Sequence, residues 1–429
     1  MKFSRRHFLE TAGIATAFTL AQPGSVIAQS KDSKLPEPIA KLKSRKAEAK
    51  PITTSEREQR MEQARQLMAE NKLDAIMITG GTSLVYFTNI RWWMSERLFA
   101  IIVPAKGNPF YVCPAFEEDR AREQIASGPG GNNAEVRTWN EDESPYQRIA
   151  EGLKERKLSA GTLGMEETVR YVFSEGLGKA APGVRITSAT PVTAGCRMIK
   201  SQHELQLMKL ANEVTLAAYE AAYLSTKEGM TQNDFGAMVQ AAHAQQGFPG
   251  GASIQVGENS ALPHGSAKPQ VIREGTILLM DGSCSVEGYE SDISRTVVLG
   301  KPTDKMKQVF EIVHKAQSAA LAAAKPGVQC QAVDAAARKV ITDAGYGPDY
   351  KHFTHRLGHG IGMDGHEWPY LVRGNTQLLV PNMTFSDEPG IYIRGEFGVR
   401  LEDDMHITEN GAELFTPQSP SLEQPFGKS

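Results

Sequence analysis

Four carboxylates and one histidine in the second half of the chain have the side-chain types of a metal site: Asp281, Asp292, His359, Glu388 and Glu402. Divalent cations such as Mn²⁺, Fe²⁺, Co²⁺ and Zn²⁺ accept oxygen and nitrogen ligands of these types. Two such ions about 3.5–4 Å apart can share a hydroxide that acts as a nucleophile. The five residues therefore predict a two-metal site and metal-assisted hydrolysis.

The two aspartates lie on either side of a predicted β-turn. The apolar run 276–281 predicts a buried strand that ends at Asp281, and a second strand containing Asp292 follows the turn that ends at Gly288. Both aspartates are equally far from the middle of this turn, so a simple hairpin places them opposite each other. Because two opposed carboxylates repel each other, this arrangement favours a bound cation.

The two glutamates have the same relation to a second predicted hairpin. Glu388 and Glu402 lie at equal distances from Gly395, the expected middle of that turn. Side-chain alternation along the returning strand separates its charged residues by face: Arg400, Glu402 and Asp404 on one face, and Asp403 on the other.

His359 lies in a glycine-rich segment, Gly-His-Gly-Ile-Gly at 358–362, where small residues allow the backbone and a ligand to approach closely. A lone histidine in such a loop is more often structural than a ligand. His355 and His366 flank His359 within twelve residues. Three histidines in so short a stretch favour a functional cluster.

Four segments in this order resemble the metal-dependent pita-bread peptidase family, which includes Xaa-Pro aminopeptidases, Xaa-Pro dipeptidases (prolidases) and methionine aminopeptidases. The segments are 279–296, 358–367, 386–392 and 398–404. The resemblance covers nearly the whole chain after its N-terminal segment. It implies an α/β N-terminal domain of the creatinase type followed by an α+β pita-bread catalytic domain, and it implies a homodimer.

The resemblance assigns roles to the candidate residues. Asp281, Asp292, His359, Glu388 and Glu402 would bind two divalent ions, with Mn²⁺ expected and Co²⁺, Zn²⁺ or Fe²⁺ as alternatives. Asp292 would bridge the ions, and Glu388 would also act as the general base. The resemblance also implies four substrate-binding residues: His264, His366, His355 and Arg400. Of these, His264 and His366 would also stabilise the oxyanion.

The implied activity is a metal-dependent exopeptidase that hydrolyses Xaa-Pro bonds, either at the N-terminus of short peptides or in dipeptides. A dipeptidase would need an arginine for the substrate carboxylate, and Arg373 is a candidate. Two other activities of the fold stay open, a lyase that cleaves dimethylsulfoniopropionate and a hydrolase of another small amide. Ser283 stands where we expect an acidic group in such a lyase.

The N-terminal 28 residues have the layout of a twin-arginine signal peptide. Arg5-Arg6 precedes a mildly apolar stretch that is too short to span a bilayer, and a small-residue cleavage site ends at Ala28. We expect export in folded form, to the periplasm or beyond, with no stable membrane insertion. Residues 29–51 have almost no large apolar side chains and predict a flexible linker, either a tether or a surface-draped arm.

The rest of the chain exceeds one ordinary hydrophobic core, which favours two domains. Alternating helix and strand signals predict an α/β domain over 52–192. Residues 193–417 predict the catalytic domain, with helices at 204–224, 232–246, 304–324 and 331–344, and 418–429 form a C-terminal tail. The net charge of −3 gives no indication of nucleic-acid binding.

Adjacent tryptophans and four cysteines have no assigned chemistry. Trp92 and Trp93 would either pack within this chain or form part of the wall of the active site in a neighbouring subunit. Cys113, Cys196, Cys284 and Cys330 have none of the spacings of a zinc or redox motif. Export permits disulfides between them, but a chain of this size does not need them.

Overall fold

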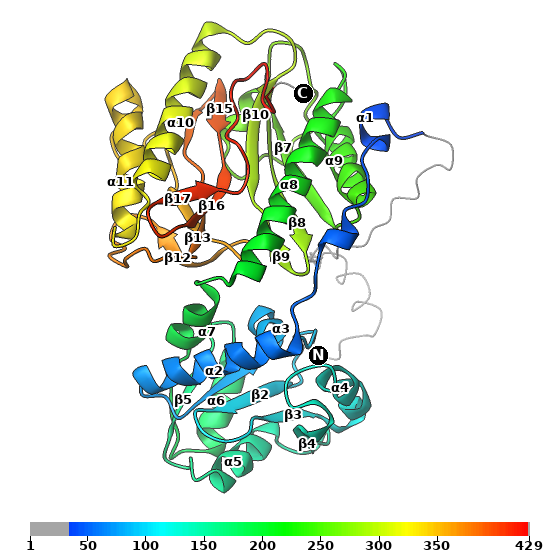
Figure 1. Ribbon diagram of the computed structural model, residues 1–429, viewed down its shortest axis with the longest axis vertical. Helices are drawn as coiled ribbons and strands as arrows, with labels where there is room; N and C mark the ends of the chain where they lie inside the picture. Colours follow the sequence, from blue (N-terminus) through cyan, green and yellow to red (C-terminus); the bar gives the residue numbers. More distant parts are fainter. Residues whose placement is uncertain (1–33, 428–429) are drawn as a thin grey trace, which may run out of the picture. The chain divides into compact units, whose positions relative to one another are not determined.

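The computed structural model describes residues 34–427, so the predicted signal peptide lies outside the described residues. From Glu37 onward the chain forms one compact unit that contains an N-terminal and a catalytic domain (Figure 1). None of the helices within residues 34–427 has the length and apolar character needed to cross a membrane.

The N-terminal domain is a six-stranded mixed sheet with the order β4-β3-β2-β1-β5-β6. Its strands are β1 (Ala75–Thr79), β2 (Ala100–Pro104), β3 (Phe110–Pro114), β4 (Glu135–Trp139), β5 (Thr162–Met165) and β6 (Arg185–Ser188). Alternate residues of β1 pack into two hydrophobic cores on opposite faces of the sheet. Ile76 and Ile78 belong to one core, and Ala75 and Met77 belong to the other. Both faces of the sheet are therefore buried, as expected for an α/β domain.

Helices cover both faces of this sheet. On one face lie α2 (Thr54–Glu70), α3 (Thr82–Thr88), α4 (Glu118–Ile125) and α7 (Thr190–Arg197), and on the other α5 (Pro145–Glu155) and α6 (Tyr171–Ala180). Thr53 begins α2 with a capping box, because its side chain accepts a hydrogen bond from the Glu56 amide and Glu56 bonds back to the Thr53 amide.

The catalytic domain contains two larger sheets and a separate hairpin. The first sheet has β7 (Gly250–Val256), β8 (Ile277–Val286), β9 (Tyr289–Glu290) and β10 (Ile293–Val298), and the second has β11 (Gly358–Gly360), β12 (Glu367–Leu371), β13 (Thr384–Asp387), β16 (Asp403–Ile407) and β17 (Ala412–Leu414). The hairpin is β14 (Gly390–Ile393) with β15 (Phe397–Arg400).

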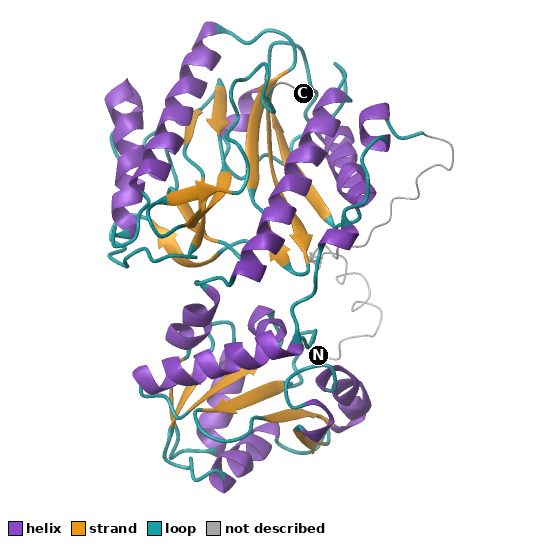
Figure 2. Ribbon diagram, in the orientation of Figure 1, coloured by secondary structure: helices purple, strands orange, loops and turns teal. Residues whose placement is uncertain are grey.

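Four long helices lie outside these sheets, as the sequence predicts for an α+β domain (Figure 2). They are α8 (Gln202–Leu224), α9 (Gln232–Gln246), α10 (Asp304–Ala323) and α11 (Cys330–Ile341). The first two share a core with β7, β8 and β10, while α10 and α11 share a core with the second sheet. The expected fourth helix is shorter than predicted, because a wider turn containing Gly345 at φ 89° follows Ile341.

The hairpin that carries Asp281 and Asp292 has a different register from the symmetric one expected. Asp281 pairs with Ser294 rather than with Asp292, because the turn is formed by Glu287 and Gly288 at φ 52° and 86°. Two consecutive positive φ angles are typical of the tight type I′ turn. The register is therefore shifted by two residues, which preserves the face on which each side chain lies.

The second hairpin has the predicted register. Gly390 pairs with Arg400 on one side of Gly395, and Asp387 pairs with Asp403 further from the turn. Glu388 and Glu402 lie between these two paired segments, where their amides donate to the Leu357 and Ser294 carbonyls. Side-chain oxygens of the two glutamates lie within 4.8 Å of each other, so the two residues face each other as predicted.

The described part of the expected linker is an ordered arm against the catalytic domain. Helix α1 (Glu37–Ala40) packs on α8 and α9 with Ile39 fully buried. The Arg45 amide donates to the Gln246 carbonyl at 2.9 Å, and the Arg45 guanidinium pairs with Glu213 at 2.9 Å. Of the two alternatives, the surface-draped arm and not the flexible tether describes residues 37–50, because one buried isoleucine and specific polar contacts fix a segment whose average composition is polar.

Candidate metal centre

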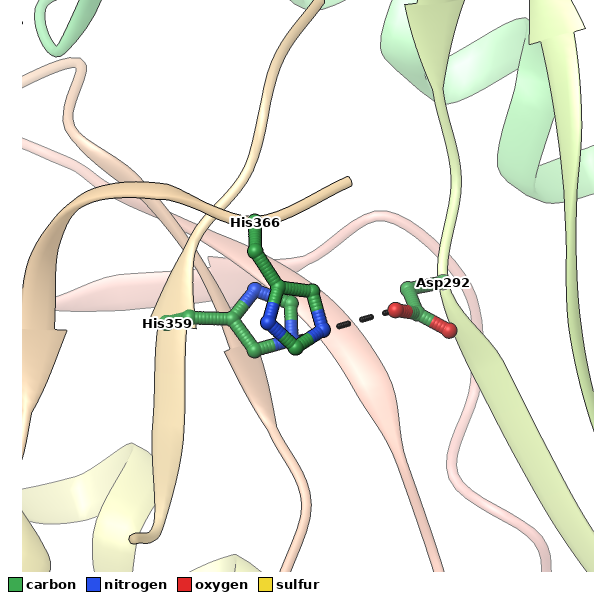
Figure 3. A group of neighbouring side chains, drawn as sticks. All are labelled: Asp292, His359 and His366. Carbon is green, nitrogen blue, oxygen red and sulfur yellow. Dashed lines mark ion pairs between the residues drawn. The ribbon is translucent and has the colours of Figure 1, made fainter. Parts of the chain in front are cut away.

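The five predicted ligands come together where the two hairpins meet the histidine segment. Their side-chain oxygen and nitrogen atoms form three overlapping groups, each with its atoms within 4.8 Å of one another. The groups are Asp281 with Asp292 and Glu402, His359 with Glu388 and Glu402, and Asp292 with His359 and His366. Figure 3 shows the last of these, with Asp292 facing the two histidine rings. Overlapping groups of this composition fit two neighbouring divalent cations.

Burial and mutual repulsion oppose ionisation of the carboxylates. Burial raises the pKa of Asp292 well above its ordinary value, and Glu402 and Asp281 raise it further. Burial, followed by Glu402, also raises the pKa of Glu388. The pKa of Glu402 rises to about 8 through burial and the neighbouring Asp281. Cations between these groups would reverse the repulsion, so the donor set fits a pair of metal ions.

His359 presents one nitrogen to the carboxylates in the form that a metal requires. Its Nδ1 lies 3.1 Å from the Gly360 carbonyl, which fixes the proton on Nδ1. The other nitrogen, Nε2, lies 3.4 Å from Glu388 and 3.8 Å from Asp292. Burial, with a smaller contribution from His366, lowers the pKa of His359 to about 3. The ring is therefore neutral, with a free electron pair on Nε2.

Arg400 and Ser294 hold two of the ligands. The Arg400 guanidinium donates to Asp281 at 2.6 Å and to the Ser294 hydroxyl at 2.9 Å. Ser294 in turn donates to Glu402 at 2.6 Å. Sequence reasoning assigned Arg400 to this region but missed Ser294, although its position two residues after Asp292 places it on the same face of the strand.

A second chain of contacts runs from Arg400 to His355. Arg400 donates to the Tyr392 hydroxyl at 3.0 Å, and this hydroxyl donates to His355 Nε2 at 2.8 Å. Burial lowers the pKa of His355 to about 3, so the ring is neutral, and its Nδ1 donates to the Arg356 carbonyl at 2.8 Å, which leaves Nε2 as an acceptor. His355 lies 3.7 Å from Glu388 and belongs to none of the three groups of possible ligands. Tyr392 had no predicted role.

Two further histidines lie at the exposed side of the site. His366 stacks on His359 with ring centroids 3.7 Å apart, and its outer part is open to solvent. His264 is also exposed, in the loop after the 3₁₀ helix Gly257–Ala261. Arg400 donates to the Pro263 carbonyl at 3.1 Å, which fixes this loop beside the metal ligands. Both imidazoles are therefore available to a bound substrate.

Comparison with known proteins agrees with this arrangement of residues. Residues 206–409 match metallopeptidase family M24, and residues 60–199 match the creatinase/prolidase N-terminal domain. The chain is 34% identical over 363 residues to the Xaa-Pro dipeptidase of Lactobacillus delbrueckii subsp. lactis, a match that covers 83% of this chain and 96% of the relative. The chain belongs to metallopeptidase family M24.

Solved structures of similar proteins cover both domains of this M24 chain. The crystal structure of dipeptidase PepE from Mycobacterium ulcerans has a TM-score of 0.81 and 32% identity, covering 87% of this chain and 99% of that one. X-Pro aminopeptidase from Thermotoga maritima has a TM-score of 0.72 and 28% identity, covering 85% and 99%. The domain order and the pita-bread fold expected from the sequence are confirmed.

The M24 site has an arginine at its mouth, and it is not the one that the sequence suggested. Arg356 stacks on the Tyr370 ring at 4.0 Å, and its Nη2 lies 3.4 Å from His366 Nδ1. Within residues 34–427, no carboxylate pairs with it. Arg373, in contrast, pairs with Asp349 at 2.6 Å beside helix α11. The proximity of Arg356 to His355 in the motif was the signal that could have identified it.

All four cysteines of the chain are buried and unpaired. Burial raises the pKa of Cys284, the cysteine nearest to a metal ligand in sequence, to about 12. A thiol that stays protonated at neutral pH is a poor nucleophile, and Cys284 belongs to none of the three groups of possible ligands within residues 34–427. The carboxylates and imidazoles of this M24 site thus remain its reactive groups.

Proposed function

We propose that this chain is a metal-dependent exopeptidase that hydrolyses Xaa-Pro bonds, with Xaa-Pro dipeptides as its substrates. The observation that carries the proposal is the meeting of four carboxylates and His359 beside Arg356, which pairs with no carboxylate within residues 34–427. The names of the relatives, dipeptidases among them, support the same activity. Mn²⁺ is the metal that we propose, because a site with four carboxylates and one imidazole suits a hard or borderline ion.

The ligand set defines how water would attack the peptide. Two bound divalent cations would supply a water molecule of lowered pKa and polarise the scissile carbonyl. Glu388 accepts the proton of this water and transfers it to the proline nitrogen as the carbon–nitrogen bond breaks. His264 and His366 donate hydrogen bonds to the carbonyl oxygen as negative charge develops on it. His355, Tyr392 and Arg400 keep the ligands oriented.

Arg356 would anchor the free carboxylate of the dipeptide. A guanidinium is planar and always charged, and it can donate two parallel hydrogen bonds to a carboxylate. Tyr370 supports the guanidinium from one face, which reduces the entropy lost when a substrate binds. An anchor at the C-terminus would restrict the site to substrates with one residue after the scissile bond. This restriction distinguishes a dipeptidase from an aminopeptidase.

The test uses metal-stripped protein reloaded with Mn²⁺, Co²⁺ or Zn²⁺ and a panel of Ala-Pro, Gly-Pro, Ala-Ala and Ala-Pro-Ala. We expect release of amino acid from the two prolyl dipeptides and little from Ala-Pro-Ala. Cleavage of the tripeptide at a similar rate would make the enzyme an aminopeptidase. Folded, metal-loaded protein that cleaves none of them would exclude Xaa-Pro hydrolysis.

Two matched variants test whether Arg356 binds the carboxylate of the substrate. Replacement Arg356→Gln should raise KM for Ala-Pro by about tenfold or more, because a charged hydrogen bond contributes roughly 1.5–3 kcal/mol. It should have a smaller effect on Ala-Pro amide, which has no carboxylate. Arg373→Gln removes an arginine of similar type away from the site and should leave both substrates unaffected. Equal effects of Arg356→Gln on the acid and the amide would contradict the anchor.

We also propose that the enzyme is exported by the twin-arginine route and acts as a homodimer. The Arg5-Arg6 pair and the apolar stretch after it support export. Changing both arginines to lysine should retain the precursor in the cytoplasm, as detected by fractionation. Sedimentation of the purified enzyme at micromolar concentration tests the dimer.

A further inference from the structure

Ion pairs hold the segment that carries His366, and they lie on the side opposite to the imidazole. His366 comes directly before β12, so its side chain and that of Glu367 lie on opposite faces of the chain. His366 is exposed at the metal site, whereas Glu367 is 7% exposed and lies among cationic side chains. A shift of Glu367 would therefore also displace His366, because a single peptide unit joins the two residues.

Two cations hold Glu367, and one comes from α7, which packs in the core of the N-terminal domain, so this domain extends beyond the expected boundary at residue 192. Arg197, in the last turn of α7, places Nη2 2.5 Å from Glu367 Oε2. Lys200, in the segment between α7 and α8, places Nζ 2.5 Å from Glu367 Oε1. All three side chains are nearly excluded from solvent. Gly362 makes room for the cluster, since a Cβ there would lie 2.6 Å from Glu367 Oε1.

A further contact holds the same segment on the other side of His366. Arg197 also lies 2.5 Å from Asp364 Oδ2, and Asp364 accepts a hydrogen bond of 2.5 Å from Thr82 in α3. Arg197 thus binds the residues two before and one after His366. The cluster contains two cations and two carboxylates, so its charges balance.

We propose that Arg197 and Lys200, through Glu367, are positioning residues for His366, so that the N-terminal domain sets where this imidazole meets the substrate. The inference rests on the proposed function, in which His366 donates to the developing oxyanion. Displacement by about 1 Å of a group that acts on the transition state can reduce turnover by up to about a hundredfold. Substrate binding elsewhere in the site would be unaffected, so the effect falls on kcat.

The first test is the variant Glu367→Gln, which keeps the shape of the side chain and removes its charge. We expect kcat for Ala-Pro to fall tenfold to a hundredfold while KM changes less than twofold. The matched control is Glu204→Gln. Glu204 forms another buried ion pair between the domains, with Arg60 at 3.0 Å, and its other hydrogen-bond partners are Ser201 and Tyr289, not residues 364–367. The control should lower the melting temperature and leave kcat within twofold.

A double-mutant cycle distinguishes positioning from general destabilisation. If Glu367 acts through His366, Glu367→Gln in a His366→Ala background should reduce kcat by less than twofold further. The same fold loss in both backgrounds would overturn the inference, and so would wild-type kcat in folded Glu367→Gln. Wild-type kcat in His366→Ala would refute the role of His366 and this inference with it, but not Xaa-Pro hydrolysis.

A second readout requires no turnover, so it still applies if the proposed function fails. Protein labelled with ¹³C at histidine Cε1 gives one signal for each ring, and His366→Ala identifies the signal of His366. In metal-free protein, this signal should shift or broaden in Glu367→Gln and stay in place in Glu204→Gln. An unchanged His366 signal in Glu367→Gln would overturn the inference.

Discussion

Asp292 illustrates how a ligand of this site lowers the stability of the folded protein when no metal is bound. Its amide donates to Asp404 at 2.8 Å, which fixes the backbone, while its carboxylate faces Glu402 and Asp281. Holding several buried carboxylates together raises their pKa and reduces the stability of the folded chain at neutral pH. Metal binding offsets this cost, so the site links stability to metal concentration.

We predict that Asp292→Asn has opposite effects on metal-free and metal-loaded protein. Without metal, loss of one negative charge should raise the melting temperature by a few degrees. With Mn²⁺ present, the variant should lose the stabilisation that the wild type gains, and its activity should fall by more than about a hundredfold. Differential scanning calorimetry with chelator and with Mn²⁺ measures both effects.

Asp387→Asn is the control for this prediction. Asp387 is fully buried, burial raises its pKa well above the ordinary value, and neither of its oxygens has a hydrogen-bond partner among residues 34–427. It belongs to none of the three metal-binding groups. The control should therefore change stability by the same amount with and without Mn²⁺. If Asp292→Asn behaved in the same way, Asp292 would not be a ligand.

At the scale of elements, a buried histidine connects helix α9 to strand β7. His243 is fully buried, its Nδ1 lies 2.9 Å from the Val239 carbonyl, and its ring lies close under Gly250. A side chain at Gly250 would begin 2.5 Å from this ring, which explains the glycine. Burial lowers the pKa of His243 to about 4, so the folded chain holds it neutral.

We predict that His243 makes the enzyme sensitive to mild acid. A histidine with a lowered folded pKa contributes fully above its unfolded pKa of about 6.5, and this contribution is lost as the pH falls toward 4. Between pH 7 and pH 5 the loss is about 2 kcal/mol. Urea unfolding at both pH values should show this difference in the wild type and a smaller one in His243→Gln. Parallel pH profiles would contradict the prediction.

Ile39 is the fully buried apolar residue of the N-terminal arm, so we predict that Ile39→Ala releases the arm. Such a substitution at a buried site costs about 2–5 kcal/mol. This cost should increase tryptic cleavage at Lys43, Arg45 or Lys46 at least tenfold, as measured by mass spectrometry of timed digests. Glu37→Ala, which breaks only the exposed pair with Lys41, should leave the cleavage rate unchanged. Equal cleavage of both variants would mean that the polar contacts hold the arm.

At the scale of the whole molecule, the two adjacent tryptophans have different surroundings. Trp92 stacks on Phe99 with ring centroids 4.1 Å apart and is part of the N-terminal core. Trp93 is 78% exposed. Packing within the chain therefore accounts for Trp92, whereas an exposed tryptophan is suited to a contact with another molecule.

We predict that Trp93→Ala raises KM for Ala-Pro severalfold without changing the melting temperature. The physical reason is the proposed homodimer, in which Trp93 would wall the active site of the neighbouring subunit. Trp92→Ala is the control and should lower the melting temperature, because it removes the stack on Phe99. Steady-state kinetics and thermal denaturation of both variants give the measurement. An unchanged KM in Trp93→Ala would exclude this role.

The sequence by itself determined most of the fold and the set of candidate ligands. Helix ranges such as 232–246 follow from periodicity and capping residues, which act over a few neighbours in the chain. The glutamate hairpin was predictable because its register depends on one local turn at Gly395. Glu388 and Glu402 could therefore be paired before any coordinates were known.

Only the tertiary structure decided contacts between distant segments. The positive φ angles at Glu287 and Gly288 shifted the aspartate hairpin by two residues, and Ile39 ordered an arm whose composition predicts disorder. Arg356 and not Arg373 lies at the site, because Asp349 binds Arg373 elsewhere. The ordered arm and the pairing of Arg373 depend on partners far apart in sequence, about which local propensity carries no information. The aspartate hairpin depends instead on the backbone conformation that its own turn adopts.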